Sequence, residues 1–113
     1  MAHDANHPSP TISTHVLDTE LGMPAAGVHV TLYRILDDGQ AVRLSQALTD
    51  ADGRIRDLLE RPLTVGDYRL EFALGSGGFF ERASLDLHIA DASRSYHVPL
   101  LKSAFALTTY RGS

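Results

Sequence analysis

The most regular stretch of the chain is Tyr68-Arg69-Leu70-Glu71-Phe72-Ala73-Leu74. Its large apolar residues stand at every second position, which is the side-chain period of a β-strand with one buried face. Shorter stretches before and after it have similar patterns and are separated by turn-forming residues. These further predicted strands comprise residues 11–18, 28–33, 42–48, 85–89, 96–101 and 104–110. The pattern therefore predicts an all-β fold.

The segments between these strands carry turn chemistry. Asp38-Gly39 and Asp52-Gly53 each place a residue that tolerates positive φ after an aspartate, as tight reversals require. Helical periodicity is scarce, and we expect at most one helical turn, at residues 79–83. Many short strands at close spacing favour an antiparallel β-sandwich over an α/β arrangement.

The composition limits the function. The chain of 113 residues fits one domain, predicted over residues 11–113, after a polar, proline-containing arm at 1–10 that we expect to be mobile. A net charge of -4 and a single lysine, Lys102, argue against nucleic acid as a partner. The absence of cysteine excludes disulfides and thiolate chemistry. Without a secretory signal or a membrane-spanning apolar stretch, we expect a cytoplasmic protein that does not bind membranes.

Histidine and arginine provide the candidate chemistry. His15 and His97 each lie in a predicted strand, and taken alone each is more often a structural histidine satisfied by its neighbours. Pro99 cannot donate a hydrogen bond to a sheet, which predicts an edge or bulged strand beside His97. Arg54 follows a turn, where an arginine is usually a solvated surface charge. His3 in the arm, like His7, has no acidic or cysteine partner, so we predict neither a metal nor a cofactor.

The chain ends in Tyr110-Arg111-Gly112-Ser113, directly after a predicted strand. This tail brings together a phenol, a guanidinium and a hydroxyl where a frayed end is expected. If the tail is ordered, it can line a polar site.

Several blocks resemble the signature positions of the 5-hydroxyisourate hydrolase branch of the transthyretin family. They occur in family order at residues 13–18, 22–28, 49–54, 66–68, 96–101 and 110–113. The middle blocks also occur in other sandwich modules, whereas the terminal Tyr-Arg-Gly-Ser is specific and distinguishes the hydrolases from the hormone-carrying transthyretins. The sequence departs from the family pattern in the short Gly75-Ser76-Gly77-Gly78 link, in Ser95 where a histidine is common, and at residues 104–109.

The resemblance implies a transthyretin-like (prealbumin-like) antiparallel sandwich of two four-stranded sheets. It also implies a homotetramer, a dimer of dimers with active sites between the dimers, that hydrolyses 5-hydroxyisourate, a small purine-derived substrate, in urate degradation. The implied catalytic residues are His15, Arg54 and His97. The implied substrate-binding residues are His15, Arg54, Tyr110, Arg111, Gly112 and Ser113.

Opening a cyclic amide needs a base for water, a donor for the developing negative charge and an acid for the departing nitrogen, and two histidines with one arginine can supply all three. We favour His97 as the water activator, His15 as an orienting or proton-transferring group and Arg54 as the electrophilic partner. Ser113 is interpreted as a substrate-positioning hydroxyl. Tyr110 either bonds the substrate or packs, and Arg111 either contacts the substrate or anchors the tail.

Two other functions fit the same fold. A noncatalytic small-ligand carrier or interaction module shares its turns, but has no evident need for His15, Arg54, His97 and the terminal motif together. A related enzyme with a different substrate is the other alternative.

Overall fold

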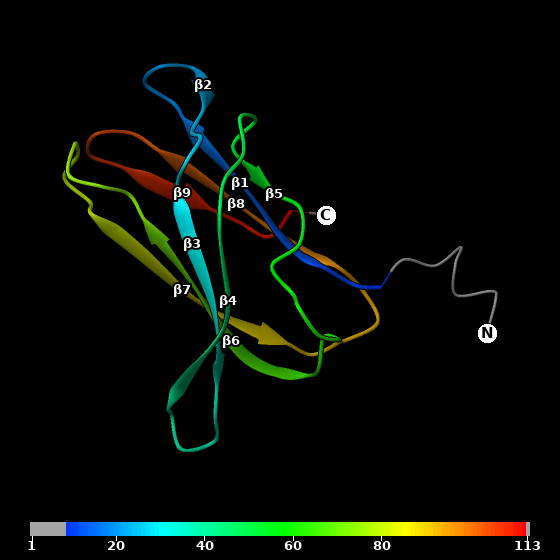
Figure 1. Ribbon diagram of the computed structural model, residues 1–113. Coiled ribbons are helices and arrows are strands. Elements are labelled where there is room, and N and C mark those ends of the chain that lie inside the picture. Colours follow the sequence, from blue (N-terminus) through cyan, green and yellow to red (C-terminus); the bar gives the residue numbers. More distant parts are fainter. Residues whose placement is uncertain (1–8, 113) are drawn as a thin grey trace.

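Two twisted β-sheets lie face to face and enclose the alternating apolar side chains (Figure 1). The computed structural model describes residues 9–112. Most of the predicted N-terminal arm, with His3 and His7, and also Ser113 lie outside the described residues. The all-β prediction is confirmed, since every element of the described part is a strand.

The first sheet has the order β2-β1-β8-β9, and β5 also pairs with β1. It therefore has five strands, where four were expected, because two short segments share one edge of β1. β1 and β8 run parallel, so the sheet is mixed and not purely antiparallel. Its strands are β1 (Ile12–Asp18), β2 (Met23–Pro24), β5 (Arg54–Ile55), β8 (Tyr96–Lys102) and β9 (Leu107–Thr109).

The second sheet has four antiparallel strands in the order β4-β3-β6-β7. The alternating stretch that begins at Tyr68 lies in β6, except for its last residue, Leu74, and its inward side chains Tyr68, Leu70 and Phe72 are buried. Each large apolar side chain buried in this way contributes roughly 1.5–3 kcal/mol relative to an exposed one. The strands of this sheet are β3 (His29–Ile35), β4 (Ala41–Leu48), β6 (Gly66–Ala73) and β7 (Arg82–Ile89).

The strand period also determines which residues of the first sheet point outward. In β1, Ile12, Thr14 and Val16 are buried between the sheets, whereas Ser13 and His15 alternate with them on the outer face. β8 begins in the same way, with Tyr96 and Val98 buried and His97 between them. The parallel register places Ser13 directly beside His97. The outer face of the first sheet thus gathers polar groups from strands far apart in the sequence.

Two local predictions are wrong. Residues 79–83 do not form a helical turn, because the backbone N–H of Phe79 donates to the carbonyl of Ala104 in the β8–β9 turn and β7 begins at Arg82. The last predicted strand is also shorter than expected, since Ser103 N–H bonds Ala106 O in that turn and only Leu107–Thr109 form β9.

Pro99 does not mark an edge strand. β8 lies between β1 and β9, in the interior of its sheet. The missing N–H instead interrupts the pairing of β8 on the side of β9. Leu100 pairs with Thr109, and His97 makes a bridge with Gly112 in the same register. The residues between these two points are not paired. The chain after β9 therefore continues beside β8 and is bonded to it again at Gly112.

The described residues contain no helix long and apolar enough to cross a membrane.

Candidate active site

His15 and Arg54 are brought together by a tight turn that leads into β5. The Asp50 carboxylate accepts hydrogen bonds from the backbone N–H groups of Asp52 at 2.9 Å and Arg54 at 3.0 Å. The bond from Arg54 is the main reason why the pKa of Asp50 lies below its usual value. The turn then pairs β5 with β1, so that Arg54 stands directly opposite His15.

Gly53 is required in this turn. Its φ of 76° lies in the left-handed region, and a Cβ there would overlap the carbonyl oxygen of Val16. The Gly53 carbonyl in turn accepts the Val16 N–H at 2.7 Å, which ties the turn to β1.

The His15 ring has a defined protonation pattern. Its Nε2 lies 2.8 Å from the carbonyl oxygen of Asp52. Because a carbonyl oxygen can only accept, Nε2 carries the proton and Nδ1 of the neutral ring holds the lone pair. The turn that supplies Arg54 therefore also orients His15.

His97 is half-buried beside these groups, with its Nδ1 2.8 Å from the Ser13 hydroxyl. Burial lowers the pKa of His97 below its ordinary value of 6.5, and the positive charges of Arg54 and His15 lower it further. The imidazole is consequently neutral near neutral pH, which is the form that can accept a proton.

The C-terminal tail reaches the same ring. Gly112 N–H donates to the His97 carbonyl at 2.7 Å. A Cβ on Gly112 would come within 2.8 Å of His97 Cδ2, so the tail approaches the ring as closely as only a glycine can. Ser113, the last predicted site residue, lies outside the described residues.

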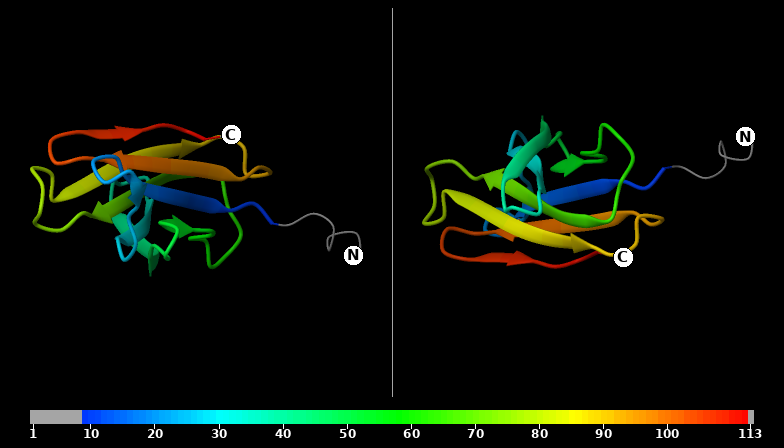
Figure 2. Two further views of the ribbon diagram at one scale, coloured as in Figure 1. Left: turned by 90° about the horizontal axis from the view of Figure 1, so that it is seen from above. Right: turned by 90° about the horizontal axis from the view of Figure 1, so that it is seen from below.

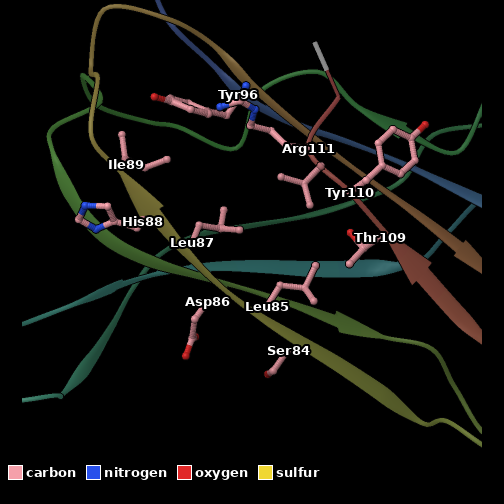
Figure 3. A pocket seen from close by; sticks show the side chains of 11 residues that line it. Ser84, Leu85, Asp86, Leu87, His88, Ile89, Tyr96, Thr109, Tyr110 and Arg111 are labelled. Atoms are coloured by element: carbon pink, nitrogen blue, oxygen red, sulfur yellow. The ribbon is translucent and has the colours of Figure 1, made fainter.

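The other tail residues face elsewhere. The tail and β7 lie side by side at one edge of the sandwich (Figure 2). Tyr110 and Arg111 line a groove of about 460 Å³ between them (Figure 3). Leu85 and Leu87 of β7 line the opposite side of this groove, and Arg111 extends toward Tyr96 (Figure 3). Within one chain, the structure thus groups His15, Arg54, His97 and Gly112, and separates Tyr110 and Arg111 from them.

A small cavity of about 160 Å³ on the outer face is lined by Arg54, His97, Ser13 and Arg56, together with Thr14 and Ile55. Sequence reasoning missed Ser13 and Arg56. Ser13 could have been found from the strand period, since it lies two positions from His15 and so shares its face. Arg56 follows the two-residue strand β5, where the sequence carries no such signal.

The arrangement offers a neutral imidazole, a guanidinium and a second oriented imidazole on one surface. Such a set can move protons and stabilise an oxyanion. In residues 9–112, no three histidine, aspartate or glutamate side chains gather closely enough to hold a metal ion.

The described residues thus form a small β-sandwich that carries a cluster of histidine and arginine side chains on the outer face of one sheet. The HIUase/Transthyretin family matches residues 12–112, and the chain belongs to this family. A 5-hydroxyisourate hydrolase from Halalkalibacterium halodurans is 41% identical over 90% of this chain and 97% of its own length.

Solved structures agree with this assignment. The 5-hydroxyisourate hydrolase of Klebsiella pneumoniae is 36% identical, covers 91% of this chain and 99% of its own, and superposes with a TM-score of 0.78. The sea bream transthyretin solved in complex with thyroxine is 30% identical, covers 90% and 94%, and has a TM-score of 0.82. The predicted transthyretin-like sandwich is therefore confirmed.

Proposed function

We propose that this protein hydrolyses 5-hydroxyisourate to 2-oxo-4-hydroxy-4-carboxy-5-ureidoimidazoline in urate degradation. The observation that carries the proposal is the joint presence of His15, Arg54 and His97 around one polar surface, in a chain that is 41% identical over almost its whole length to a hydrolase of that substrate. Water is the only co-reactant that an amide hydrolysis consumes.

In the proposed mechanism, His97 is the general base. Its neutral ring takes a proton from water as the water oxygen adds to the ring carbonyl carbon of the substrate. When the carbon–nitrogen bond then breaks, the proton passes to the departing nitrogen. The lowered pKa of His97 supports this role, since it keeps the ring in its basic form near neutral pH.

Arg54 stabilises the negative charge that develops on the carbonyl oxygen. Its guanidinium stays charged and presents paired donors to planar acceptors. The Asp50 turn supports this role, because it fixes the backbone from which the guanidinium extends toward the cavity. His15 orients the substrate or transfers a proton, and its Nδ1 is the atom for that task because Asp52 O engages Nε2.

The tail completes the proposed binding site. Gly112 lies against His97 in the same chain, and Ser113 follows it as the proposed positioning hydroxyl. Tyr110 and Arg111 line the neighbouring groove. We assign Tyr110, Arg111, Gly112 and Ser113 to substrate binding. In this assignment Tyr110 and Arg111 act from that groove or on a second copy.

We also propose that the protein is a homotetramer. The cavity beside His97 is about 160 Å³, smaller than the roughly 300 Å³ at the lower end of ligand sites, so one chain forms only part of an enclosed site. Leu21, Phe79 and Phe105 are 70%, 71% and 81% exposed, which is apolar surface that association would cover. Light scattering at micromolar concentration should give four times 12.3 kDa, and a monomer would contradict the assembly.

The decisive experiment follows the substrate directly. Urate oxidase generates 5-hydroxyisourate from urate, and the ultraviolet absorbance then reports its decay with and without the purified protein. We expect the protein to accelerate the decay beyond the spontaneous rate. Decay at the spontaneous rate would refute the hydrolase function and favour the alternative of a small-ligand carrier. A thyroxine-binding assay would then test that alternative.

A further inference from the structure

Ser13 is a polar residue of the site to which the mechanism above assigns no role. It stands on the outer face of β1, next to His97 of β8 in the parallel register. Its Oγ lies 2.8 Å from His97 Nδ1 and 3.5 Å from the carbonyl oxygen of Tyr96. The hydroxyl is therefore the side-chain partner of the proposed base.

Ser13 and Gly112 hold the His97 ring from two sides. Ser13 meets the ring at Nδ1, and Gly112 approaches the opposite edge at Cδ2 so closely that a Cβ would stand 2.8 Å away. With both edges fixed, Nε2 is the ring nitrogen left for a bound substrate. The ring also lines the cavity that contains Arg54.

The position of the ring proton decides whether His97 can act as a base. A serine hydroxyl has one proton to donate and also accepts. If the hydroxyl donates to Tyr96 O, which can only accept, its oxygen can accept a hydrogen bond from a protonated His97 Nδ1. Nε2 of the neutral ring then holds the lone pair. If it donates to Nδ1 instead, Nε2 carries the proton and cannot take one from water.

The charges around the ring favour the first arrangement. Arg54 carries a permanent positive charge that acts on His97, and it lines the same cavity on the outer face of the sheet. A cation attracts a nitrogen lone pair and repels an N–H dipole, so the cavity beside Arg54 favours an unprotonated Nε2.

We propose that Ser13 is a positioning residue whose hydroxyl oxygen accepts a hydrogen bond from the protonated Nδ1 of neutral His97. This bond leaves Nε2 unprotonated and presents it to the substrate as the base. The role of Nε2 in catalysis rests on the proposed function, whereas the state of the ring does not. The two can therefore be tested separately.

Nuclear magnetic resonance of the full-length protein labelled with ¹⁵N-histidine tests the ring. Long-range ¹H–¹⁵N spectra distinguish protonated from unprotonated ring nitrogens, and a His97→Gln variant identifies the signals of His97 among six histidines. At a pH above the pKa of His97, we expect a protonated Nδ1 and an unprotonated Nε2. In Ser13→Ala the Nε2-protonated form should gain population, and Ser13→Thr should restore the original form.

Turnover provides the second measurement. Ser13→Ala should lower kcat about five- to tenfold, the factor that one neutral hydrogen bond typically supplies, while KM changes little because Ser13 acts through His97. Ser13→Thr should recover most of the rate. Ser95→Ala is the matched control. The Ser95 hydroxyl accepts the Thr11 N–H and so joins the residue before β1 to the residue before β8, away from the ring, and its loss should change neither spectrum nor rate.

A wild-type His97 protonated at Nε2 would overturn the proposal, as would a Ser13→Ala protein with an unaltered ring spectrum and kcat. An inactive wild-type protein whose ring still responds to Ser13 would instead refute the hydrolase function and support the positioning role. If Ser13→Ala fails to fold, a comparison of Ser13→Thr with Ser13→Cys tests the proposal instead. Only Ser13→Thr, which keeps the hydroxyl, should maintain the wild-type ring spectrum of His97.

Discussion

Replacing Gly112 by alanine tests how much catalysis depends on the contact between the tail and His97. The added Cβ would stand 2.8 Å from His97 Cδ2, about 0.7 Å short of the roughly 3.5 Å at which carbon atoms begin to attract one another. Either the ring or the tail must move by that amount. Misplacing a reacting group by about 1 Å can cost about 100-fold in rate, so we expect kcat to fall by roughly 10- to 100-fold.

Stability should change much less than kcat in this variant. The tail's recorded backbone hydrogen bond at this point runs from Gly112 to His97, and one such bond contributes about 0.5–1.5 kcal/mol net. Urea unfolding should therefore show a loss of no more than about 2 kcal/mol. A large loss of rate with a small loss of stability would separate positioning from folding.

Gly77→Ala is the matched control for Gly112→Ala. No heavy atom lies within 4 Å of the Cβ that this change would add, and its φ is outside the left-handed region. We expect wild-type kcat and stability. If Gly112→Ala retained full kcat while a crystal structure showed the tail still bonded to His97, the close contact would have no catalytic importance.

Three further predictions address the proposed mechanism. His97→Ala and Arg54→Ala should lower kcat/KM by about 100-fold or more with native circular dichroism, whereas His29→Ala and Arg43→Ala, on the other sheet, should not; wild-type turnover in either site variant would refute its assigned role. Because the pKa of His97 lies below 6.5 and only the neutral ring is a base, kcat/KM should decline with falling pH along a curve whose midpoint lies below pH 6.5, and a midpoint above 6.5 would point to another base. Deleting residues 110–113 should abolish most activity while leaving stability and oligomeric mass nearly unchanged, and a fully active truncated protein would exclude the tail from the site.

Strand periodicity predicted most of the fold, because six of the strands have seven or eight residues, long enough for apolar and polar side chains to alternate visibly. β2 and β5 have two residues each, too few for any period, and they exist because β1 offers them an open edge. Their addition is the reason why the first sheet has five strands. Likewise, the single missing donor of Pro99 could be read from the sequence, but its effect depends on which neighbouring strand it faces.

The composition of the site was more predictable than its geometry. His15, Arg54 and His97 were identified from blocks of sequence, but their proximity depends on the parallel pairing of β1 with β8, which joins residues 84 positions apart. The separation of Arg111 from Gly112 follows from the strand period, since Gly112 bridges to His97 and the preceding residue must then face the other side. The place of Tyr110 beside the groove does not follow from this period. Treating the tail as one functional unit overlooked this alternation.

Backbone similarity alone does not decide what the protein does. The chain superposes at least as well on the thyroxine-bound sea bream transthyretin, at a TM-score of 0.82, as on the Klebsiella pneumoniae hydrolase, at 0.78. A carrier and an enzyme can thus be built on one sandwich, and the difference must lie in side chains that the backbone only presents. In this chain those side chains occupy the outer face of the first sheet, where a base with a lowered pKa, an arginine on a rigid turn and a close-packed tail meet. Binding alone requires none of these features, whereas hydrolysis requires a proton acceptor and a fixed positive charge, so the site and not the fold carries the case for an enzyme.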